Sequence, residues 1–367
     1  MIYLSTQCFP PDLGGIQTYL YSVASELVAR GREVCVFADA LRGEDTKPFD
    51  SAQPFPVHRF GGFKPIRRRK KASQLARMMS STTENVVLCD TWKSLEHIPA
   101  STCKQAKVIC LAHGMEFPSG SDQNKKLRVQ KAFAKADVIL ANSHFTANRM
   151  VDYLPDGKVA EILLPGISVP LETGSEIQSR VQAKKAQCDP ALLTISRIEA
   201  RKGHDKIIAA IVRLKQRYPN IHYYVIGNGP DKERLEGLVA DADIKQYVTF
   251  LGSVSEQEKT AWLSAVDIFV MPSRAEGNSV EGFGLVYLEA AYFGKPSLAG
   301  EVGGAGDAVV HGETGLLCDS TSVDSVVAGL SELLDENSRK SMGAAAQARV
   351  KAELLWPKVI DRLEAYF

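Results

Sequence analysis

The sequence contains no long hydrophobic run, and its charges nearly cancel. None of its apolar stretches approaches the roughly 18 residues that a membrane-spanning helix needs. Its 367 residues include 44 Lys and Arg against 43 Asp and Glu, a net charge of +1. A strand-like apolar run begins at Met1, with no signal peptide ahead of it. We therefore expect a cytoplasmic protein, with any membrane contact being peripheral and on the inner face of the cytoplasmic membrane.

Motifs for metals, disulfides and common nucleotide cofactors are also missing. The seven cysteines are scattered and form no Cys-x-x-Cys pair. An odd cysteine count without metal-ligand spacing favours reduced thiols and no metal site. The glycine-containing turns, Gly14-Gly15 and Gly227-Asn228-Gly229, lack the third glycine of a dinucleotide fingerprint, and neither is a P-loop. Hydrophobic residues nevertheless make up 45% of the chain, which is ample for buried cores.

Strand and helix patterns alternate along the chain in two consecutive series. The first opens with a strand over 1–6, a helix ending at 31 and a strand over 34–38, and the second opens with a strand over 192–195. Such units form parallel sheets that bind ligands at the carboxyl ends of their strands. The sequence therefore predicts an α/β protein with two Rossmann-like, doubly wound domains, 1–165 and 166–352, facing a deep cleft.

The segment Pro272–Glu289 follows an apolar run, 268–271, that is typical of a buried strand. A helix starting near Phe283 would present unpaired N–H groups and a positive dipole end to an anion. Glu281 precedes this start and Glu289 lies about two turns in, on the same side. Carboxylates there can accept hydrogen bonds from sugar hydroxyls. The alternative is an ordinary capped helix, which an isolated Glu-x7-Glu spacing would favour.

Three other turns at predicted strand ends carry candidate ligand-binding residues. Arg197 and Lys202 lie five residues apart in one strand-to-helix turn, where together they can neutralise a diphosphate. His113 follows a strand over 108–111, at the edge where such sheets bind ligands. Gly14-Gly15 at a helix start can bring backbone N–H groups to a phosphate. Each feature taken alone also suits a surface turn or a structural histidine.

A basic segment, residues 64–71, gives the first half of the chain its positive charge. Residues 1–165 carry 22 Lys and Arg against 16 Asp and Glu. The segment combines cations with nearby apolar residues, and such helices bind anionic membrane surfaces. A solvated helix face is the alternative, and a nucleic-acid role is disfavoured because no aromatic platform accompanies the charges. The predicted membrane-surface residues are Arg67, Arg68, Arg69, Lys70 and Lys71.

Taken together, these motifs resemble the family 4 glycosyltransferases, which are retaining enzymes with the two-domain GT-B fold. The resemblance covers nearly the whole chain and rests on Phe-Pro-Pro-x2-Gly-Gly, His113-Gly114, Ser196-Arg197…Lys202-Gly203, Glu281…Glu289, Gly303-Gly304 and Thr314-Gly315-Leu316. Residues 273–289 look most like bacterial GDP-mannose-dependent mannosyltransferases that act on lipid or glycan acceptors. One departure is Gly306-Asp307, where family members commonly have Pro-Glu.

The resemblance implies metal-independent transfer of a hexose, best taken as mannose from GDP-mannose, to a cell-envelope glycan or glycolipid such as a lipopolysaccharide precursor. Domain 1–165 would bind the acceptor, with a last helix at about 353–367 packing back on it, and domain 166–352 would bind the nucleotide sugar. Arg197 and Lys202 would stabilise the leaving diphosphate, Glu281 would contact the sugar, and His113 would line the sugar and acceptor site. The implied donor-binding residues are Gly14, Gly15, Gly227, Leu251, Val254, Phe283, Gly284, Leu285 and Glu289, and the implied acceptor-side residues are Asn142 and Ser143.

Three other functions remain open at the level of sequence. A nucleotide-sugar epimerase or hydrolase on the same fold would need no acceptor. A non-catalytic sugar-nucleotide-binding protein would not require Arg197, Lys202, Glu281 and Glu289 together. A metal-dependent transferase of the other common fold would need an Asp-x-Asp at a strand end, and Asp241-Ala242-Asp243 lies in a helix-like polar stretch.

Overall fold

The computed structural model describes residues 1–12, 14–79, 84–117, 122–277 and 279–367. Leu13 of the first glycine turn and Asn278 of the 272–289 segment therefore lie outside the described residues. The chain divides into two compact units. The first unit comprises Met1–Gly166 and Trp356–Phe367, and the second comprises Ile167–Leu355.

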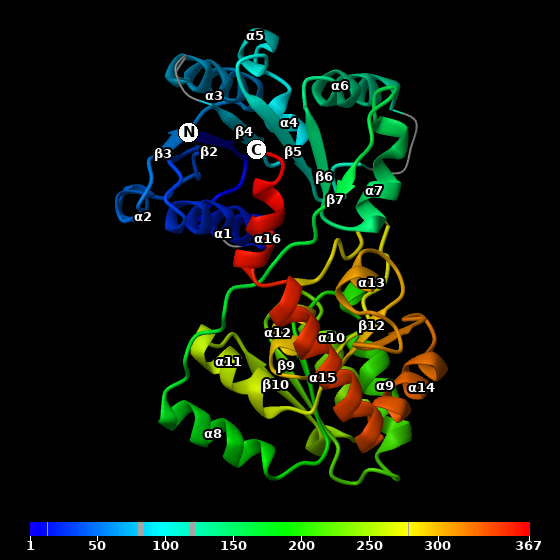
Figure 1. Cartoon of the computed structure of the whole chain (residues 1–367). Helices are drawn as coiled ribbons and strands as arrows, with labels where there is room; N and C mark the ends of the chain where they lie inside the picture. The colour runs from blue at the N-terminus through cyan, green and yellow to red at the C-terminus, as the bar shows by residue number, and fades with distance from the viewer. Residues whose placement is uncertain (13, 80–83, 118–121, 278) are drawn as a thin grey trace. The chain divides into compact units, whose positions relative to one another are not determined.

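The first unit is built on a seven-stranded sheet in the order β3-β2-β1-β4-β5-β6-β7, and its paired strands are parallel. Its strands are β1 Ile2–Ser5, β2 Val34–Asp39, β3 Val57–Phe60, β4 Val86–Cys89, β5 Lys107–Ala112, β6 Val138–Ala141 and β7 Glu161–Ile162. Its helices are α1 Gly15–Ala29, α2 Lys47–Ser51, α3 Lys64–Met78, α4 Trp92–Leu95, α5 Ala100–Cys103, α6 Gln123–Phe133, α7 His144–Met150, the short η1 Val151–Tyr153 and α16 Trp356–Glu364. Figure 1 labels most of these elements.

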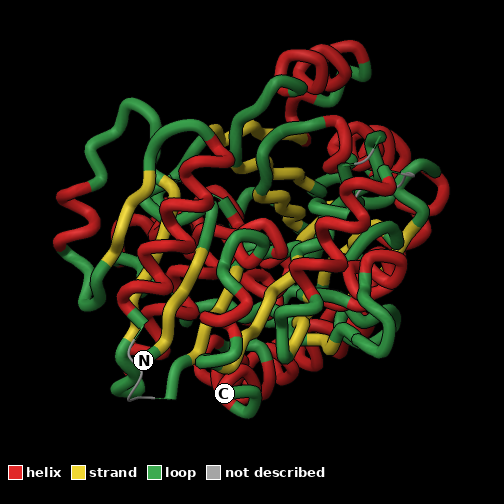
Figure 2. The backbone as a smooth tube through the Cα atoms, turned by 90° about the horizontal axis from the view of Figure 1, so that it is seen from above, coloured by secondary structure: helices red, strands yellow, loops and turns green. Residues whose placement is uncertain are grey.

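Successive side chains along these strands point to opposite faces of the sheet, and both faces are buried. On β1, Tyr3 joins one hydrophobic cluster, while Ile2 and Leu4 join the other. This is the two-residue period of a strand covered on both sides. Figure 2 shows strands in yellow running between helices in red.

The last helix, α16, belongs to the first unit and packs against α1 (Figure 1). Its buried residues follow helical spacing and are Trp356, Val359, Ile360 and Leu363. On its polar side, the guanidinium of Arg30 reaches Asp361 at 2.7 Å and Glu364 at 2.9 Å. The amphipathic pattern thus joins the chain's C-terminal segment to the face of its first helix.

The second unit is built on a six-stranded parallel sheet in the order β10-β9-β8-β11-β12-β13. Its strands are β8 Ala191–Ile195, β9 His222–Ile226, β10 Val248–Gly252, β11 Ile268–Met271, β12 Ser297–Gly300 and β13 Gly315–Cys318. Its helices are α8 Ser175–Lys185, η2 Ala200–Lys202, α9 His204–Leu214, α10 Lys232–Asp241, η3 Lys245–Tyr247, α11 Glu256–Ala265, α12 Leu285–Tyr292, α13 Ala305–Ala308, α14 Val323–Leu333 and α15 Glu336–Glu353.

The predicted fold class, two parallel-sheet Rossmann-like α/β domains, is confirmed. In each sheet the strand order reverses once, between β1 and β4 in the first and between β8 and β11 in the second. Ligands of such sheets bind outside the carboxyl ends of the strands at that reversal. Among the described residues, no helix has both the length and the apolar character needed to cross a bilayer.

Candidate active site

At the carboxyl ends of β9 and β12, glycines lie where the backbones that follow β8 and β11 approach too closely for a side chain. A Cβ on Gly227, after β9, would overlap the carbonyl oxygen of Ser196, which follows β8. A Cβ on Gly300, at the end of β12, would overlap the carbonyl oxygen of Ser273. Gly227 also has φ 129°, a left-handed conformation that glycine adopts without strain. These contacts bring the turns that follow the central strands close together.

Two of the three predicted catalytic residues of the second unit, Lys202 and Glu281, meet at this edge. The ammonium of Lys202 lies 2.5 Å from a carboxylate oxygen of Glu281, 79 positions along the chain. Arg201 lies 3.6 Å from the same carboxylate. Arg197 is different, because its side chain is 71% exposed and its nearest carboxylate is Glu199, at 3.2 Å. The structure therefore brings Lys202 and Glu281 together and leaves Arg197 reaching into solvent.

The carboxyl group of Glu281 is held in its charged form. Burial acts to raise its pKa, but the charge and hydrogen bond of Lys202, helped by Arg201, outweigh burial and hold the pKa below its ordinary value. A carboxylate that stays ionised can accept hydrogen bonds from hydroxyl groups. This geometry suits contact with a sugar.

The turn that carries Lys202 is fixed by its neighbours. Gly203, at φ 79°, ends η2 and begins α9, and a Cβ there would overlap the carbonyl oxygen of Pro272. His204 then bridges Ser196 Oγ at 3.1 Å and Tyr223 Oη at 2.7 Å. Burial, together with the charge of Lys202, lowers the pKa of His204 to about 4, so its imidazole is neutral at pH 7. An uncharged hydrogen-bonding side chain thus ties β8, β9 and α9 together.

Helix α12 begins two residues later than predicted, at Leu285 rather than near Phe283. The reason is Gly284, whose left-handed φ of 90° ends the preceding loop and makes it the N-cap. Gly284 provides no capping side chain, and Phe283 is buried. The N–H of Tyr287 donates to the carbonyl oxygen of Gly284 at 3.0 Å, while a helix start leaves earlier N–H groups of its first turn available to a ligand.

Glu289 is consequently about one turn into α12 rather than two. One carboxylate oxygen lies 3.2 Å from the ammonium of Lys259 on α11, which also reaches Glu256 at 2.7 Å. Burial acts to lower the pKa of Lys259, but the two carboxylates outweigh it and raise the pKa. Glu289, one of the predicted donor-binding residues, is therefore held by a cation from a neighbouring helix.

Two further predicted donor-binding residues, Leu251 and Val254, lie near the end of β10. Leu251 and Val254 are both partly buried. Between them, Ser253 accepts a hydrogen bond from Asn228 at 2.9 Å. The ends of β9 and β10 are adjacent and lie next to the end of β8. They carry Gly227 after β9, and Leu251 and Val254 near the end of β10.

In the first unit, His113 lies at the end of β5 with its imidazole buried. Its Nε2 atom has no hydrogen-bond partner among the described residues, and its ring meets Tyr19 edge-on at 5.5 Å. Its backbone N–H donates to the buried carboxylate of Glu116 at 2.8 Å. A buried nitrogen without a partner has hydrogen-bonding capacity for a ligand.

Gly14 and Gly15 are exposed at the start of α1, where a Cβ on Gly15 would meet nothing within 4 Å. Asn142 is partly buried after β6. The prediction that Ser143 contacts an acceptor is wrong for its side chain, which is 0% exposed. Its hydroxyl instead caps α7 by accepting from the N–H of Thr146 at 3.1 Å.

The basic segment forms the first half of α3, and the prediction that all five of its cations face a membrane is wrong. Lys71 is 1% exposed and lies 3.0 Å from Asp39. Arg67 lies 2.8 Å from the other oxygen of the same carboxylate, and Arg68 donates to Gln7 at 2.9 Å. These residues occur about one helical turn apart, on the face that packs on the sheet. Arg69 and Lys70 are exposed.

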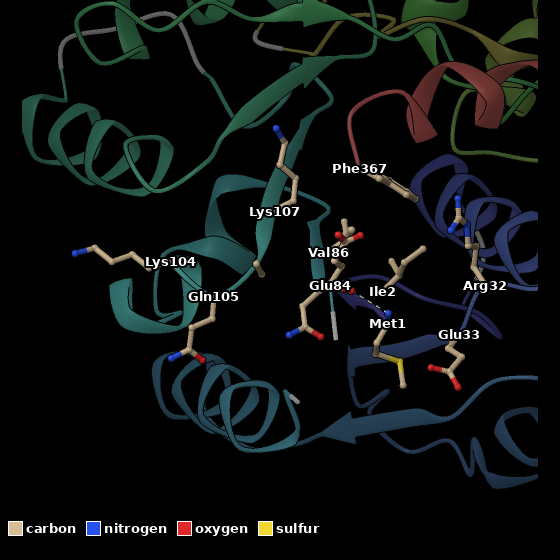
Figure 3. A pocket seen from close by; sticks show the side chains of 12 residues that line it. Met1, Ile2, Arg32, Glu33, Glu84, Val86, Lys104, Gln105, Lys107 and Phe367 are labelled. Atoms are coloured by element: carbon tan, nitrogen blue, oxygen red, sulfur yellow. Dashed lines mark hydrogen bonds between the residues drawn. The ribbon is translucent and has the colours of Figure 1, made fainter. Parts of the chain in front are cut away.

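Among the hollows lined by described residues, two are relevant to the location of the site. One, of about 390 Å³, is lined by Glu199, Ala200, Arg201, Pro230, Asp231, Glu276 and Ser279, beside the Lys202 turn. The other, of about 450 Å³, lies at the amino ends of β1, β4 and β5 in the first unit, lined by residues such as Arg32, Lys107 and Phe367 (Figure 3). It lies at the opposite sheet edge from His113 and contains no predicted site residue.

Sequence reasoning missed Glu199, Arg201 and Lys259. Arg201 directly precedes Lys202, but its adjacency to Glu281 depends on β8 lying beside β11.

The Asp-x-Asp sequence lies away from any strand end, because Asp241 ends α10 and Asp243 follows it with φ 50°. Within the described part of the chain, no group of three or more His, Cys, Asp or Glu side chains could hold a metal ion.

Comparison with known sequences gives matches along almost the whole chain. Residues 13–169 match the profile described as Glycosyltransferase Family 4, and residues 175–349 match Glycosyl transferases group 1. A GDP-mannose-dependent monoacylated alpha-(1-6)-phosphatidylinositol monomannoside mannosyltransferase of Corynebacterium glutamicum is 31% identical, over 98% of this chain and 95% of that protein. A GDP-mannose-dependent alpha-(1-6)-phosphatidylinositol monomannoside mannosyltransferase of Mycobacterium tuberculosis is 29% identical, over 99% and 96%.

Comparison with solved structures identifies the same architecture. HepE of Anabaena in complex with UDP has a TM-score of 0.79 at 17% identity, covering 100% of this chain and 99% of that one. A glycosyltransferase from Rickettsia africae has a TM-score of 0.79 at 18% identity, covering 99% and 97%. At these identities the likeness shows the fold, which is the GT-B architecture.

Proposed function

The chain belongs to glycosyltransferase family 4, and from this membership we propose that it transfers mannose from GDP-mannose to a hydroxyl of a glycolipid acceptor. Full-length relatives at 31% and 29% identity carry that donor in their names and act on phosphatidylinositol mannosides. The acceptor of this chain is accordingly a cell-envelope glycolipid, with a lipid phosphate and a sugar or cyclitol hydroxyl as the chemistry to be recognised.

The observation that carries the proposal is the meeting of Lys202 and Glu281 at the reversal point of the second sheet, 2.5 Å apart. Lys202, with Arg197 from the same turn, would stabilise the diphosphate as it leaves. Removing one such preorganised donor typically costs about 10²- to 10³-fold in rate. Glu281, kept ionised, would accept hydrogen bonds from the transferred mannose. Glu289, paired with Lys259, would contact the ribose of the donor.

The two units would divide the substrates. We assign the nucleotide sugar to the second unit, and the acceptor to the first unit, where His113 offers an unpartnered Nε2. Gly14 and Gly15, exposed at the start of α1, would provide backbone N–H groups for a phosphate. Asn142 stays an acceptor-side residue in this proposal.

We also propose that transfer retains the anomeric configuration and requires no metal. The two cations of the Arg197–Lys202 turn offer the charge compensation that a divalent ion would otherwise supply to a diphosphate. The mechanism that we prefer is attack by the acceptor hydroxyl on the front face of the sugar, guided by a phosphate oxygen of the donor. The sequence motifs point to no side chain as a covalent nucleophile. An α-linked product in the NMR spectrum and a rate unchanged by EDTA are the expected results.

Peripheral attachment to the inner face of the cytoplasmic membrane would bring the enzyme to such an acceptor. Exposed cations on α3, Lys64, Arg69 and Lys70, lie beside two exposed apolar side chains, Phe63 at 72% and Ile66 at 54%. Basic helices with exposed apolar residues bind anionic bilayer surfaces. The proposal therefore retains two of the five predicted membrane-surface residues, Arg69 and Lys70, and adds Phe63, Lys64 and Ile66.

Glu281→Ala tests the central assignment. The variant should lose mannose transfer by about 10²-fold or more, because it lacks a contact to the reacting sugar, yet it should still bind GDP. Glu236→Ala on α10, half exposed and paired only with Lys232 at 3.6 Å, is the control and should retain both properties. Calorimetry with GDP and a radiolabelled transfer assay give the two readouts.

If Glu281→Ala is folded but no longer binds GDP, the assignment of Glu281 to the sugar is wrong. Release of free mannose or an isomerised nucleotide sugar by the wild-type protein, with no acceptor present, would instead support the hydrolase or epimerase alternative. GDP binding without turnover of any kind would support a sugar-nucleotide-binding protein.

A further inference from the structure

Arg201 lies between two carboxylates of the second unit. Its Nε donates to Glu199 at 2.9 Å, and its guanidinium lies 3.6 Å from Glu281. On the far side of Glu199 is Arg197 at 3.2 Å, and on the far side of Glu281 is Lys202 at 2.5 Å. Five charges of alternating sign therefore follow one another across the turn between β8 and α9 and the loop after β11.

We propose that Arg201 is a positioning residue of the donor site: it is the counter-ion that stays on Glu281 when Lys202 turns to the diphosphate, and Glu199 holds it there. This inference rests on the proposed function, which assigns Lys202 to the donor diphosphate. It adds two residues, Arg201 and Glu199, that the motif resemblance does not provide.

The physical argument concerns a carboxylate that is only 15% exposed. Leaving a largely buried carboxylate without any cation destabilises the fold by more than an intact ion pair stabilises it. Lys202 has one compact ammonium and cannot move to a diphosphate without weakening its contact with Glu281. Arg201 removes this conflict because Glu281 keeps a cation when Lys202 moves.

The surroundings of Arg201 favour a fixed position. Its carbonyl oxygen accepts from the N–H of Arg274 at 2.7 Å. The guanidinium of Arg274 in turn donates two hydrogen bonds, of 2.8 and 3.2 Å, to the carboxylate of Asp205 on α9. The backbone of Arg201 is thus attached to the loop after β11, while Glu199 sets the direction of its side chain. An Arg fork can contact two carboxylates at once, which suits this place better than Lys.

The first experiment is a double-mutant cycle on the nucleotide-free protein, with Arg201→Gln, Glu281→Gln and the double variant. The readout is the midpoint of thermal unfolding. If Arg201 is a counter-ion of Glu281, the double variant should lose clearly less than the sum of the two single losses. Additive losses would overturn the inference, since residues without a shared interaction behave additively.

The second experiment titrates GDP into the same variants by calorimetry. Arg201→Gln should weaken GDP binding at least about threefold, because Lys202 is then retained by Glu281. Arg201→Lys should restore part of that loss, and Glu199→Gln should show a smaller loss than Arg201→Gln. In the Glu281→Gln background, Arg201→Gln should have no further effect. Arg213→Gln, which removes a half-exposed arginine of α9, is the control and should bind GDP normally.

The outcomes separate this inference from the proposed function. If the wild-type protein and the Arg201→Gln variant bind GDP equally well, the inference is overturned and the proposed function is not. Equal weakening by Arg201→Gln in the wild-type and Glu281→Gln backgrounds would do the same. A wild-type protein that binds no GDP would overturn both.

Discussion

At the scale of single residues, His204 shows how an uncharged side chain can hold a charged turn in place. It is 1% exposed and bonds Ser196 and Tyr223, which come from the turn after β8 and from β9. Burial, with the nearby Lys202, lowers its pKa to about 4. A protonated imidazole here would be a buried positive charge and would repel the ammonium of Lys202 that is assigned to the diphosphate.

The low pKa of His204 predicts a loss of stability in mild acid. An unfolded chain takes up the proton near pH 6.5, whereas the folded protein resists it until about pH 4. Stability therefore falls as the pH falls between these values. By pH 5 the loss from this residue amounts to about 2 kcal/mol. His204→Gln should unfold at a lower midpoint at pH 7 and show a weaker pH dependence, as measured by thermal unfolding at pH 7 and pH 5; parallel curves for both proteins would refute the assignment.

At the scale of elements, the start of α12 depends on one glycine. Gly284 has φ 90°, and a Cβ on it would lie 2.5 Å from ring carbons of Tyr287. Tyr287 cannot move away easily, because it is buried and donates to the carbonyl oxygen of Met271 at 2.6 Å. The geometry of the helix start, where the donor is proposed to bind, thus requires the absence of a side chain.

Two Gly→Ala substitutions should therefore act in opposite directions. Gly284→Ala should destabilise the protein by more than about 1 kcal/mol and weaken GDP binding, because both backbone strain and the Tyr287 clash oppose it. Gly237→Ala, inside α10 with open space around it, should stabilise by about 0.5–1 kcal/mol. Denaturant unfolding and GDP calorimetry would show this, and a neutral Gly284→Ala would contradict the proposed geometry.

At the scale of the whole molecule, the distribution of charge bears on how the chain would reach the glycolipid acceptor that we propose for it. The first 165 residues carry the excess of cations, and α3 concentrates it. Part of that excess is used inside the fold, since Lys71 and Arg67 both pair with Asp39. Exposed Arg69 and Lys70, with Phe63 and Ile66, are what remains for a bilayer.

Vesicle binding tests this surface. Reversing Arg69 and Lys70 to Glu should weaken binding to anionic vesicles by at least about tenfold, since each cation near such a surface contributes about 1 kcal/mol. Arg213→Glu with Lys340→Glu makes the same change of net charge in the second unit and should leave binding unchanged. Co-sedimentation with phosphatidylglycerol vesicles provides the measurement. Equal losses in the two double variants would mean that net charge, and not α3, decides binding.

Local sequence pattern was enough to predict the fold class and the segments of the chain that carry the candidate site residues. Alternating strand and helix patterns are local, and two βα series can form only parallel sheets with functional residues at the strand ends. Arg197, Lys202, His113 and Glu281 could be placed at such ends from their position after apolar runs. The family resemblance followed from the same local spacing.

Tertiary structure decided which of these residues have partners, because partners come from distant parts of the chain. Glu281 meets Lys202 and Arg201 only because β11 lies beside β8. Lys71 is buried because the carboxylate of Asp39, 32 positions earlier, lies beneath α3. Local pattern fixes an element and the face that a side chain occupies, whereas charge pairing and burial depend on which strands become neighbours.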